Sequence, residues 1–474
     1  MANADHVTQD GALSGTGERE LCGPRLFPVV LVLSAILWCF TMTGGRHVFV
    51  PEVLSAAYDS QGEHLLRGEA EVDGDAIRHE AIIVNGKAQM YFGPFPAFLR
   101  IPLNLIYPAG RGSWSRLSGF GAGVVALAAF AALIGAALGR TSLCLRWQAW
   151  LGNASLVGFA FASPLLFLLG NLSIYNEAVV WGFAWSVAAL FFVQRARETE
   201  GRLLTGALLA FSSCAGAALL SRVTFGVPFL FIAPLLAWEL RSRNRGLRCA
   251  ALFIPLGLAL MFQFLLSYAR FGTFAGISYE NYINPVHREF VRQFGIFNLG
   301  RVPWSFADYF GFEFPRLESA APFLRAARHG YAFPKLYSLP FSEAFLPVTW
   351  CSSWLLLGAI PGLVILFRRG RVAPLDRAIA GAFIVECLLV LSFHALAQRY
   401  AADLYPFLIF CFLVFLRNAK MLVPFRYLLV ALVTFSVLVN SLATVSWLVD
   451  ADQNVPAETR AAWKMFLAPR SVTR

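Results

Sequence analysis

Residues 117–138 read LSGFGAGVVALAAFAALIGAAL, a run that contains no charged side chain. An α-helix rises about 1.5 Å per residue, so about 20 apolar residues cross the roughly 30 Å of bilayer hydrocarbon. This run therefore predicts a membrane-spanning helix. The same reasoning predicts about eleven spans in all; the others are residues 26–45, 150–169, 178–193, 203–220, 223–238, 249–266, 350–367, 378–393, 401–416 and 427–448.

The composition agrees with a membrane protein. Hydrophobic residues make up 58% of the 474-residue chain and charged residues only 14%, whereas about a quarter of the residues in soluble proteins are charged. We expect an all-α membrane protein with one polytopic domain over residues 26–449. Residues 1–25 are polar and aperiodic, which predicts a disordered cytoplasmic tail, and residues 450–474 are expected to form a second tail.

The basic residues predict the orientation, because short cytoplasmic connections retain Arg and Lys. Every second connection is rich in arginine, as in residues 195–202 and 241–248, whereas the intervening short connections carry few basic residues. This alternation predicts a multi-pass protein of the inner (plasma) membrane with a cytoplasmic N-terminus and an extracytoplasmic C-terminus. Two long segments, about 46–116 and 267–348, then become extracytoplasmic loops.

Several classes of function are not supported. The net charge of +11 is dispersed between the spans, so nucleic acid is not a predicted partner. The eight cysteines show no CxxC or Cys/His spacing, so neither disulfides nor a metal site are predicted. Phosphate-binding loops, GxSxG, HExxH and dinucleotide fingerprints do not occur. The need for a divalent metal stays open.

The first long loop carries a group of carboxylates. A helix beginning at Pro51 would align Glu52, Asp59 and Glu63 on one face, because their spacings of seven and four residues match the helical period. Such an amphipathic helix on the membrane surface would point three carboxylates toward a site. A plain solvated acidic face is the alternative.

Two further features follow in the same loop. Asn85-Gly86 lies between short apolar runs and predicts a β-hairpin. The segment GPFPAFLRIP, residues 93–102, predicts a short re-entrant or interfacial segment, because its prolines interrupt a regular span. Arg100 in this segment is expected either to reach lipid headgroups or to offer a bidentate donor to a phosphate.

Other polar residues lie at the extracytoplasmic ends of spans. They are Asn176 and Glu177, Arg222 in the tight turn after the fifth span, and Arg399 with Asp403. Arg399 and Asp403 are four residues apart, so a simple helical ion pair is one interpretation. A shared site is the other. Carboxylates and arginines at the membrane boundary suit glycosyl transfer from a phosphate-bearing lipid, which needs a base for the acceptor hydroxyl and cations for the departing phosphate.

Four stretches resemble a known family: YDSQGEHLLRGEAEV (58–72), GKAQMYFGPFPAFLRIP (86–102), RFGTFAGISYENY (270–282) and QRYAADLYPF (398–407). Together they resemble the GT-C superfamily of polytopic glycosyltransferases, in particular bacterial proteins related to family 39 and the RgtA/B/C/D-like group. The resemblance implies a polyprenyl-phosphate-linked sugar as donor and an extracytoplasmic active site. The acidic residues usual in the family just after the first span are absent from residues 44–50, GGRHVFV.

The resemblance also implies roles for individual residues. A carboxylate of the first loop would act as general base, with Asp59 preferred, Glu52 second and Glu63 beside them. Arg399 and Arg222 would contact the donor phosphate. Tyr400 and the second long loop would shape the acceptor pocket. The expected partners are membrane lipid and a lipid-linked sugar; the sugar, the acceptor and any protein partner are not predicted.

Two other classes are considered. A secondary transporter or flippase of a lipid-linked or anionic substrate would place ionisable groups near the middle of the membrane. Only Glu386, near the middle of the ninth predicted span, has that position, and we expect it to face the interior of the bundle. A non-catalytic scaffold would need no gathering of carboxylates and arginines at one level.

Overall fold

The computed structural model describes residues 27–242, 246–274, 276–277, 279–311, 313–326, 341–368, 370, 372–418, 423–450 and 454–468. The predicted tail 1–25 lies outside these residues. The predicted spans all fall on helices: α1 (Phe27–Thr43), α5 (Ser115–Leu138), α6 (Leu145–Phe161) with α7 (Pro164–Gly170), α8 (Ile174–Glu198), α9 (Gly201–Ser221), α10 (Val223–Glu239), α11 (Gly246–Phe271), α15 (Ser353–Phe367), α16 (Pro374–Leu391), α17 (Tyr405–Asn418) and α18 (Val423–Asp450).

Among the described residues, seven helices are long and apolar enough to cross a membrane. The other predicted spans form α1, α10 and α15, which have 17, 17 and 15 residues, and α16, which carries the charges of Asp376, Arg377 and Glu386. This helix set confirms the predicted all-α polytopic membrane fold.

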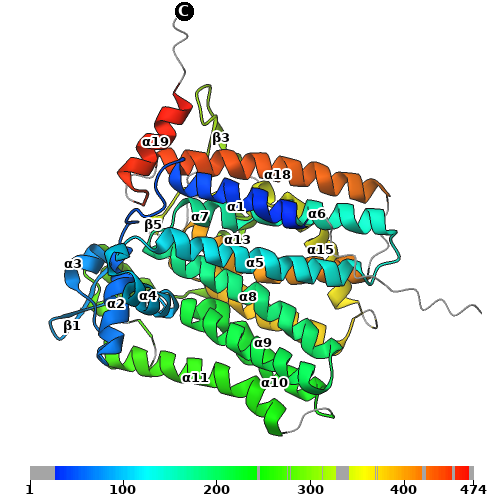
Figure 1. Ribbon diagram of the computed structural model, residues 1–474, viewed down its shortest axis with the longest axis horizontal. Helices are drawn as coiled ribbons and strands as arrows, with labels where there is room; N and C mark the ends of the chain where they lie inside the picture. Colours follow the sequence, from blue (N-terminus) through cyan, green and yellow to red (C-terminus); the bar gives the residue numbers. More distant parts are fainter. Residues whose placement is uncertain are drawn as a thin grey trace, which may run out of the picture.

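The long helices lie side by side, with α18 along one edge of the molecule and α11 along the other (Figure 1). Between these edges α8 packs against α5 and α9, α9 packs against α11, and α15 packs against α17. The most apolar part of α8 is 83% buried, whereas that of α11 is only 22% buried. Leu258, Met261 and Leu265 of α11 are exposed, which is the expected surface of a helix that faces lipid.

A break between α6 and α7 shows how the bundle tolerates non-helical backbone. Pro164 begins α7, and the Ser163 hydroxyl accepts a hydrogen bond from the Leu165 amide. From α18, the Asn440 side-chain amide donates to the carbonyls of Phe161 (2.7 Å) and Ser163 (3.1 Å). These bonds satisfy backbone oxygens that water cannot reach inside a membrane.

The first loop forms a folded cap at one end of the bundle, which we call the loop end (Figure 1). It contains α2 (Ala56–Leu66), α3 (Gly74–Ile77), η1 (Arg78–Glu80), β1 (Ile82–Val84), β2 (Lys87–Gln89), α4 (Phe95–Ile106) and η2 (Pro108–Gly110). Strands β1 and β2 pair antiparallel, and Asn85 and Gly86 have φ of 51° and 77°. The predicted hairpin is therefore confirmed, with positive φ at both turn residues as a type I′ turn requires.

The predicted helix start at Pro51 is wrong. Leu54 has a φ of 59°, a left-handed conformation that interrupts a helix, and α2 begins only at Ala56. Glu52 therefore lies outside the helix that carries Asp59 and Glu63, so the three carboxylates do not share a helical face.

The second loop is also ordered over its described residues. It contains η3 (Tyr279–Asn281), α12 (Pro285–Phe294), η4 (Leu299–Arg301), α13 (Val302–Phe310), β3 (Arg316–Leu317), β4 (Leu324–Arg325), β5 (Phe341–Ser342) and α14 (Val348–Cys351). Arg301 is fully buried, and its guanidinium donates to the carbonyls of Phe294, Gly295, Ile296 and Ser392. Strand β5 pairs parallel with β6 (Ala395–Leu396), just before η6 (Gln398–Leu404).

The C-terminal segment contains a helix packed on the loop end. Helix α19 (Ala457–Leu467) places the Trp463 indole N–H 3.2 Å from the Thr41 carbonyl. Thr459 accepts a hydrogen bond of 2.7 Å from Arg116. This part of residues 450–474, expected to be a tail, is thus a docked element.

Candidate functional site

The three predicted catalytic carboxylates have separate partners. Glu52 is buried and its Oε1 lies 2.7 Å from Arg116 Nε. Glu63 is partly exposed and forms an ion pair of 2.6 Å with Arg111. Asp59 is buried beneath α4. The three carboxylates therefore do not face a common site, and that expectation is wrong.

Asp59 belongs to a group that we call the buried loop network: Asp59, Arg100, Asn104, Ser115 and Glu177. Its carboxylate accepts from the Asn104 amide at 2.7 Å, and Arg100 Nε lies 3.9 Å from it. Arg100 Nη2 lies 2.6 Å from both carboxylate oxygens of Glu177, and the Ser115 hydroxyl also donates to Glu177 at 2.6 Å. Every member is buried.

This network corrects two interpretations. Arg100 neither reaches the surface toward lipid nor presents a free fork to a phosphate, because its charge is matched by Glu177. Asn176 is likewise buried and donates to the Asn171 carbonyl at 2.7 Å. The network joins α2, α4, α5 and α8, so its members hold the first loop on the bundle, where removal of either partner leaves an uncompensated buried charge.

A different carboxylate of the first loop lies among aromatic residues. Glu80 is buried at the end of η1, and its carboxylate accepts hydrogen bonds of 2.7 Å from the hydroxyls of Tyr91, Tyr175 and Tyr282. These tyrosines come from the first loop, α8 and the second loop. Burial, with the Glu80 charge nearby, raises the pKa of Tyr91 and Tyr282 above its ordinary value. Both phenols therefore stay protonated at neutral pH and donate to Glu80.

The two predicted phosphate-binding arginines lie beside this carboxylate. Arg399 stacks on the ring of Tyr175, with 4.9 Å between its Cζ atom and the ring centroid, and on the ring of Tyr400 at 5.0 Å. Arg222 stacks on the same Tyr400 ring at 4.7 Å. Since Tyr175 also binds Glu80, one continuous group contains Glu80, Tyr175, Arg222, Arg399 and Tyr400, which we call the loop-end site.

Each arginine is held by a carboxylate, though not by the one that sequence spacing suggested. Arg399 Nη1 lies 2.6 Å and 2.8 Å from the carboxylate oxygens of Glu343 in the second loop. Arg222 Nε lies 3.2 Å from Asp403, which also accepts from the Thr224 hydroxyl. The Arg399–Asp403 pair considered above does not form, because residues 398–404 are a 3₁₀-helix, in which positions four apart diverge.

A histidine-containing wall adjoins the tyrosines. The rings of His287 and His394 lie 5.8 Å apart, and both contact a tyrosine edge: His287 meets Tyr282 at 5.3 Å and His394 meets Tyr279 at 5.2 Å. Burial lowers the pKa of His287 to about 4 and that of His394 to about 3. Both imidazoles are therefore neutral at pH 7, which leaves an aromatic surface beside the site.

Sequence reasoning identified the arginines, Tyr400 and Asp403 but missed Glu80. Glu80 shares no helical spacing with other acids, and its tyrosine partners lie 11, 95 and 202 residues away in the chain. The sequence near Glu80 offers one local indication that it has a fixed position. It lies shortly before the Asn85-Gly86 hairpin, whose turn sets the register of the strands that flank it.

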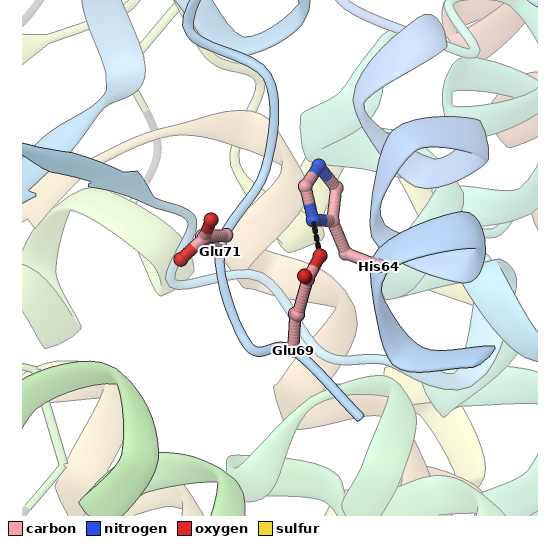
Figure 2. Close-up of side chains that lie close together, drawn as sticks. All are labelled: His64, Glu69 and Glu71. Carbon is pink, nitrogen blue, oxygen red and sulfur yellow. Dashed lines mark hydrogen bonds and ion pairs between the residues drawn. The ribbon is translucent and has the colours of Figure 1, made fainter. Parts of the chain in front are cut away.

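Among the described residues, one group has the spacing of metal ligands: His64, Glu69 and Glu71, whose ligand atoms lie within 4.8 Å of one another. Figure 2 shows the His64 ring bonded to Glu69, with Nδ1 and Oε2 2.7 Å apart. His64 Nε2 lies 3.3 Å from Asp73, and Glu71 forms an ion pair with Lys87. Protein partners thus engage each of the three, and we assign no metal here.

Glu386 lies within the bundle, as expected. It is fully buried in α16, and neither carboxylate oxygen has a hydrogen-bond partner within the described part of the chain.

No known family model matches the sequence, and no curated protein sequence is similar to it. The structure is similar to the apo form of an Archaeoglobus fulgidus oligosaccharyltransferase, with 12% identity and a TM-score of 0.51 over 94% of this chain. It also matches ArnT from Cupriavidus metallidurans bound to undecaprenyl phosphate (13% identity, TM-score 0.46, 83% of this chain) and in the apo state (14%, 0.41, 93%).

The chain spans 60% of the oligosaccharyltransferase, and 60% and 77% of the two ArnT chains. At these identities the oligosaccharyltransferase similarity shows the fold alone. The chain therefore has the fold that the resemblance to the GT-C superfamily implies.

Proposed function

We propose that this protein is a membrane glycosyltransferase that moves a sugar from a polyprenyl-phosphate donor to a lipid, glycan or protein acceptor, with its active site at the loop end. The observation that carries the proposal is the loop-end site itself. Arg222 and Arg399 flank Tyr400, and Tyr175 connects Arg399 to the Glu80 carboxylate. The site thus combines cations for a phosphate with a carboxylate for a hydroxyl.

The arginines suit the donor phosphate. A guanidinium presents a planar fork that matches phosphate oxygens. The side chains of Arg222 and Arg399 keep 22% and 13% of their surface exposed, whereas that of Arg100 keeps none. In our proposal the donor phosphate joins or replaces Glu343 at Arg399, and both arginines stabilise the charge that grows on the departing phosphate.

Glu80 takes the role of general base in this proposal. The acceptor hydroxyl gives its proton to Glu80 as its oxygen bonds to the anomeric carbon of the sugar. The bond between that carbon and the phosphate oxygen breaks, and polyprenyl phosphate leaves with the electron pair. We prefer Glu80 to Asp59, Glu52 and Glu63, because only Glu80 is connected to the arginines through shared tyrosines. Three tyrosine hydroxyls fix its orientation.

The site faces the extracytoplasmic side in this proposal, because the arginine-rich connections 195–202 and 241–248 lie at the opposite ends of the helices that carry it. The sugar is a hexose or a pentose.

Incubation of the purified protein with labelled polyprenyl-phosphate sugars tests the proposal. We expect release of polyprenyl phosphate together with a labelled product. The transporter alternative makes a different prediction: proteoliposomes would move the intact lipid-linked sugar between leaflets without consuming it. Movement of intact donor with no released polyprenyl phosphate, across a panel of hexose and pentose donors, would contradict a transferase.

A further inference from the structure

A polar cavity lies at the other end of the bundle, which we call the opposite end. Its volume is about 580 Å³, and it is lined by the last turns of α8, α10 and α17 and the first turn of α16. In the loop-end site, Tyr175 lies at the other end of α8, Arg222 directly precedes α10, and Arg399 and Tyr400 lie in η6 before α17. Helix α8 has 25 residues, so about 38 Å separate its ends at 1.5 Å per residue.

Aromatic residues mark the level of this end. Trp150, Trp238 and Tyr427 are exposed, and Arg241 stacks on Trp238 at 4.8 Å. Arg426 stacks on Trp147 at 4.6 Å. Exposed tryptophan and tyrosine with adjacent arginine are typical of the membrane–water interface. The cavity therefore lies at the height of lipid headgroups, in the leaflet opposite to the loop-end site.

The charges in the cavity are unevenly paired. Arg140 forms an ion pair with Glu198. Arg197 binds two carboxylates, at 2.7 Å from Asp376 and 3.2 Å from Glu239. This leaves one arginine of the cavity, Arg417, without an ion-pair partner among the described residues.

Arg417 is the unusual member of the cavity. Its Nη2 donates to the Gln194 side-chain oxygen. Its Nε and the Gln194 Nε2 are both buried, and neither has a hydrogen-bond partner within the described residues. Unmatched buried donors are costly, and a guanidinium with free donors in a polar cavity matches an oxyanion with several acceptor oxygens.

We propose that the opposite-end cavity binds a phosphate group at Arg417 and Gln194, as carried by a phospholipid headgroup of that leaflet. Arg417 and Gln194 both line the cavity, and when their side chains turn toward the phosphate, its oxygens accept from Arg417 Nε and Gln194 Nε2. The carboxylates on Arg197 accommodate a headgroup amine when one is present. This site does not depend on the proposed transfer reaction, since it lies at the far end of the helices and shares no residue with the loop-end site.

Native mass spectrometry of the full chain in detergent tests the site, with phosphatidylglycerol, phosphatidylethanolamine and inorganic phosphate as separate probes. Loss of a charge-assisted contact weakens binding by about tenfold or more. We expect that loss in Arg417→Gln, an intermediate loss in Arg417→Lys, and wild-type binding in Arg241→Gln, which removes a charge at the same end outside the cavity.

The probes separate the sources of the phosphate. Binding of either lipid that depends on Arg417 assigns a headgroup, and binding of inorganic phosphate alone that depends on Arg417 assigns a free anion at the same residues. The Lys variant, which keeps the charge, supplies the test should Arg417→Gln not fold. Equal lipid and phosphate binding by wild type and both Arg417 variants, or an equal loss in Arg241→Gln, would overturn the proposal.

Discussion

The buried loop network and the loop-end site both combine acids with arginines, yet they differ in how each charge is matched. In the network, Arg100 and Glu177 are fully buried and meet at 2.6 Å. In the loop-end site, Arg222 and Arg399 remain partly exposed and stack on tyrosine rings. A charge buried against a permanent partner holds the fold together, whereas a partly exposed arginine on an aromatic surface can exchange its partner for a ligand.

Arg100→Ala tests the first half of this comparison and should have the largest effect. The substitution leaves Glu177 buried without its counter-ion, and breaking such a pair costs about 3–5 kcal/mol of stability. We expect little folded protein in the membrane, measured by fluorescence-detected size exclusion. Arg111→Ala, which removes a surface pair with Glu63, is the matched control and should cost less than about 1 kcal/mol. Equal yields of the two variants would contradict the structural role.

Asp59→Asn should lower stability more than activity. An amide cannot accept from both Asn104 and the Gly112 backbone N–H as the carboxylate does, and an unmatched buried donor costs about 1–3 kcal/mol. We expect a lower melting temperature with turnover per folded molecule close to wild type. A normal melting temperature with turnover reduced by about 10² or more would return the role of base to Asp59.

Arg399→Lys tests the second half of the comparison, which concerns the partly exposed arginines of the loop-end site. Lysine keeps the charge but loses the fork and the planar stacking on Tyr175 and Tyr400. We expect about a tenfold rise in KM for the donor, as for loss of one charge-assisted hydrogen bond, with an unchanged melting temperature. Unchanged donor kinetics would show that Arg399 serves only to hold Glu343.

The histidine wall predicts a pH dependence of stability. His394 has a folded pKa of about 3, against about 6.5 when unfolded. Between these values the unfolded chain binds the proton and the folded chain does not, so stability falls as pH drops below about 6.5, by up to about 1.4 kcal/mol per pH unit. His394→Phe should flatten the melting-temperature profile between pH 6.5 and 5 relative to wild type. An unchanged slope would contradict the burial argument.

The sequence predicted the parts of the molecule that depend on local pattern. Every span predicted from hydropathy falls on a helix, and Asn85-Gly86 located the hairpin. Both predictions depend on the composition of contiguous residues. Arg222 and Arg399 were placed at one level for the same reason. The helix predicted from Pro51 is wrong because Leu54 has a left-handed conformation, which its residue type does not indicate.

Long-range partners were beyond the sequence. Glu80 becomes part of a site only because Tyr175 of α8 and Tyr282 of the second loop fold onto it. Arg100 likewise has a side chain suited to binding phosphate, but it forms a buried ion pair with Glu177, 77 residues away in the chain. Tertiary contacts decide which arginine stays partly exposed and can reach a ligand. Spacing along one helix does not encode these contacts.

The most direct test of the central claim is the turnover of purified Glu80→Gln with a polyprenyl-phosphate sugar that the wild type consumes. A positioned base contributes about 10²–10⁴ in rate, so we expect turnover to fall by that factor. The amide keeps the shape of Glu80, and a tyrosine hydroxyl can turn to accept from it. The melting temperature should therefore fall less than in Asp59→Asn, and donor binding should stay close to wild type. Glu63→Gln, which alters a first-loop carboxylate paired at the surface, should retain full turnover. Full turnover in folded Glu80→Gln would contradict the assignment of the loop-end site as the place of reaction.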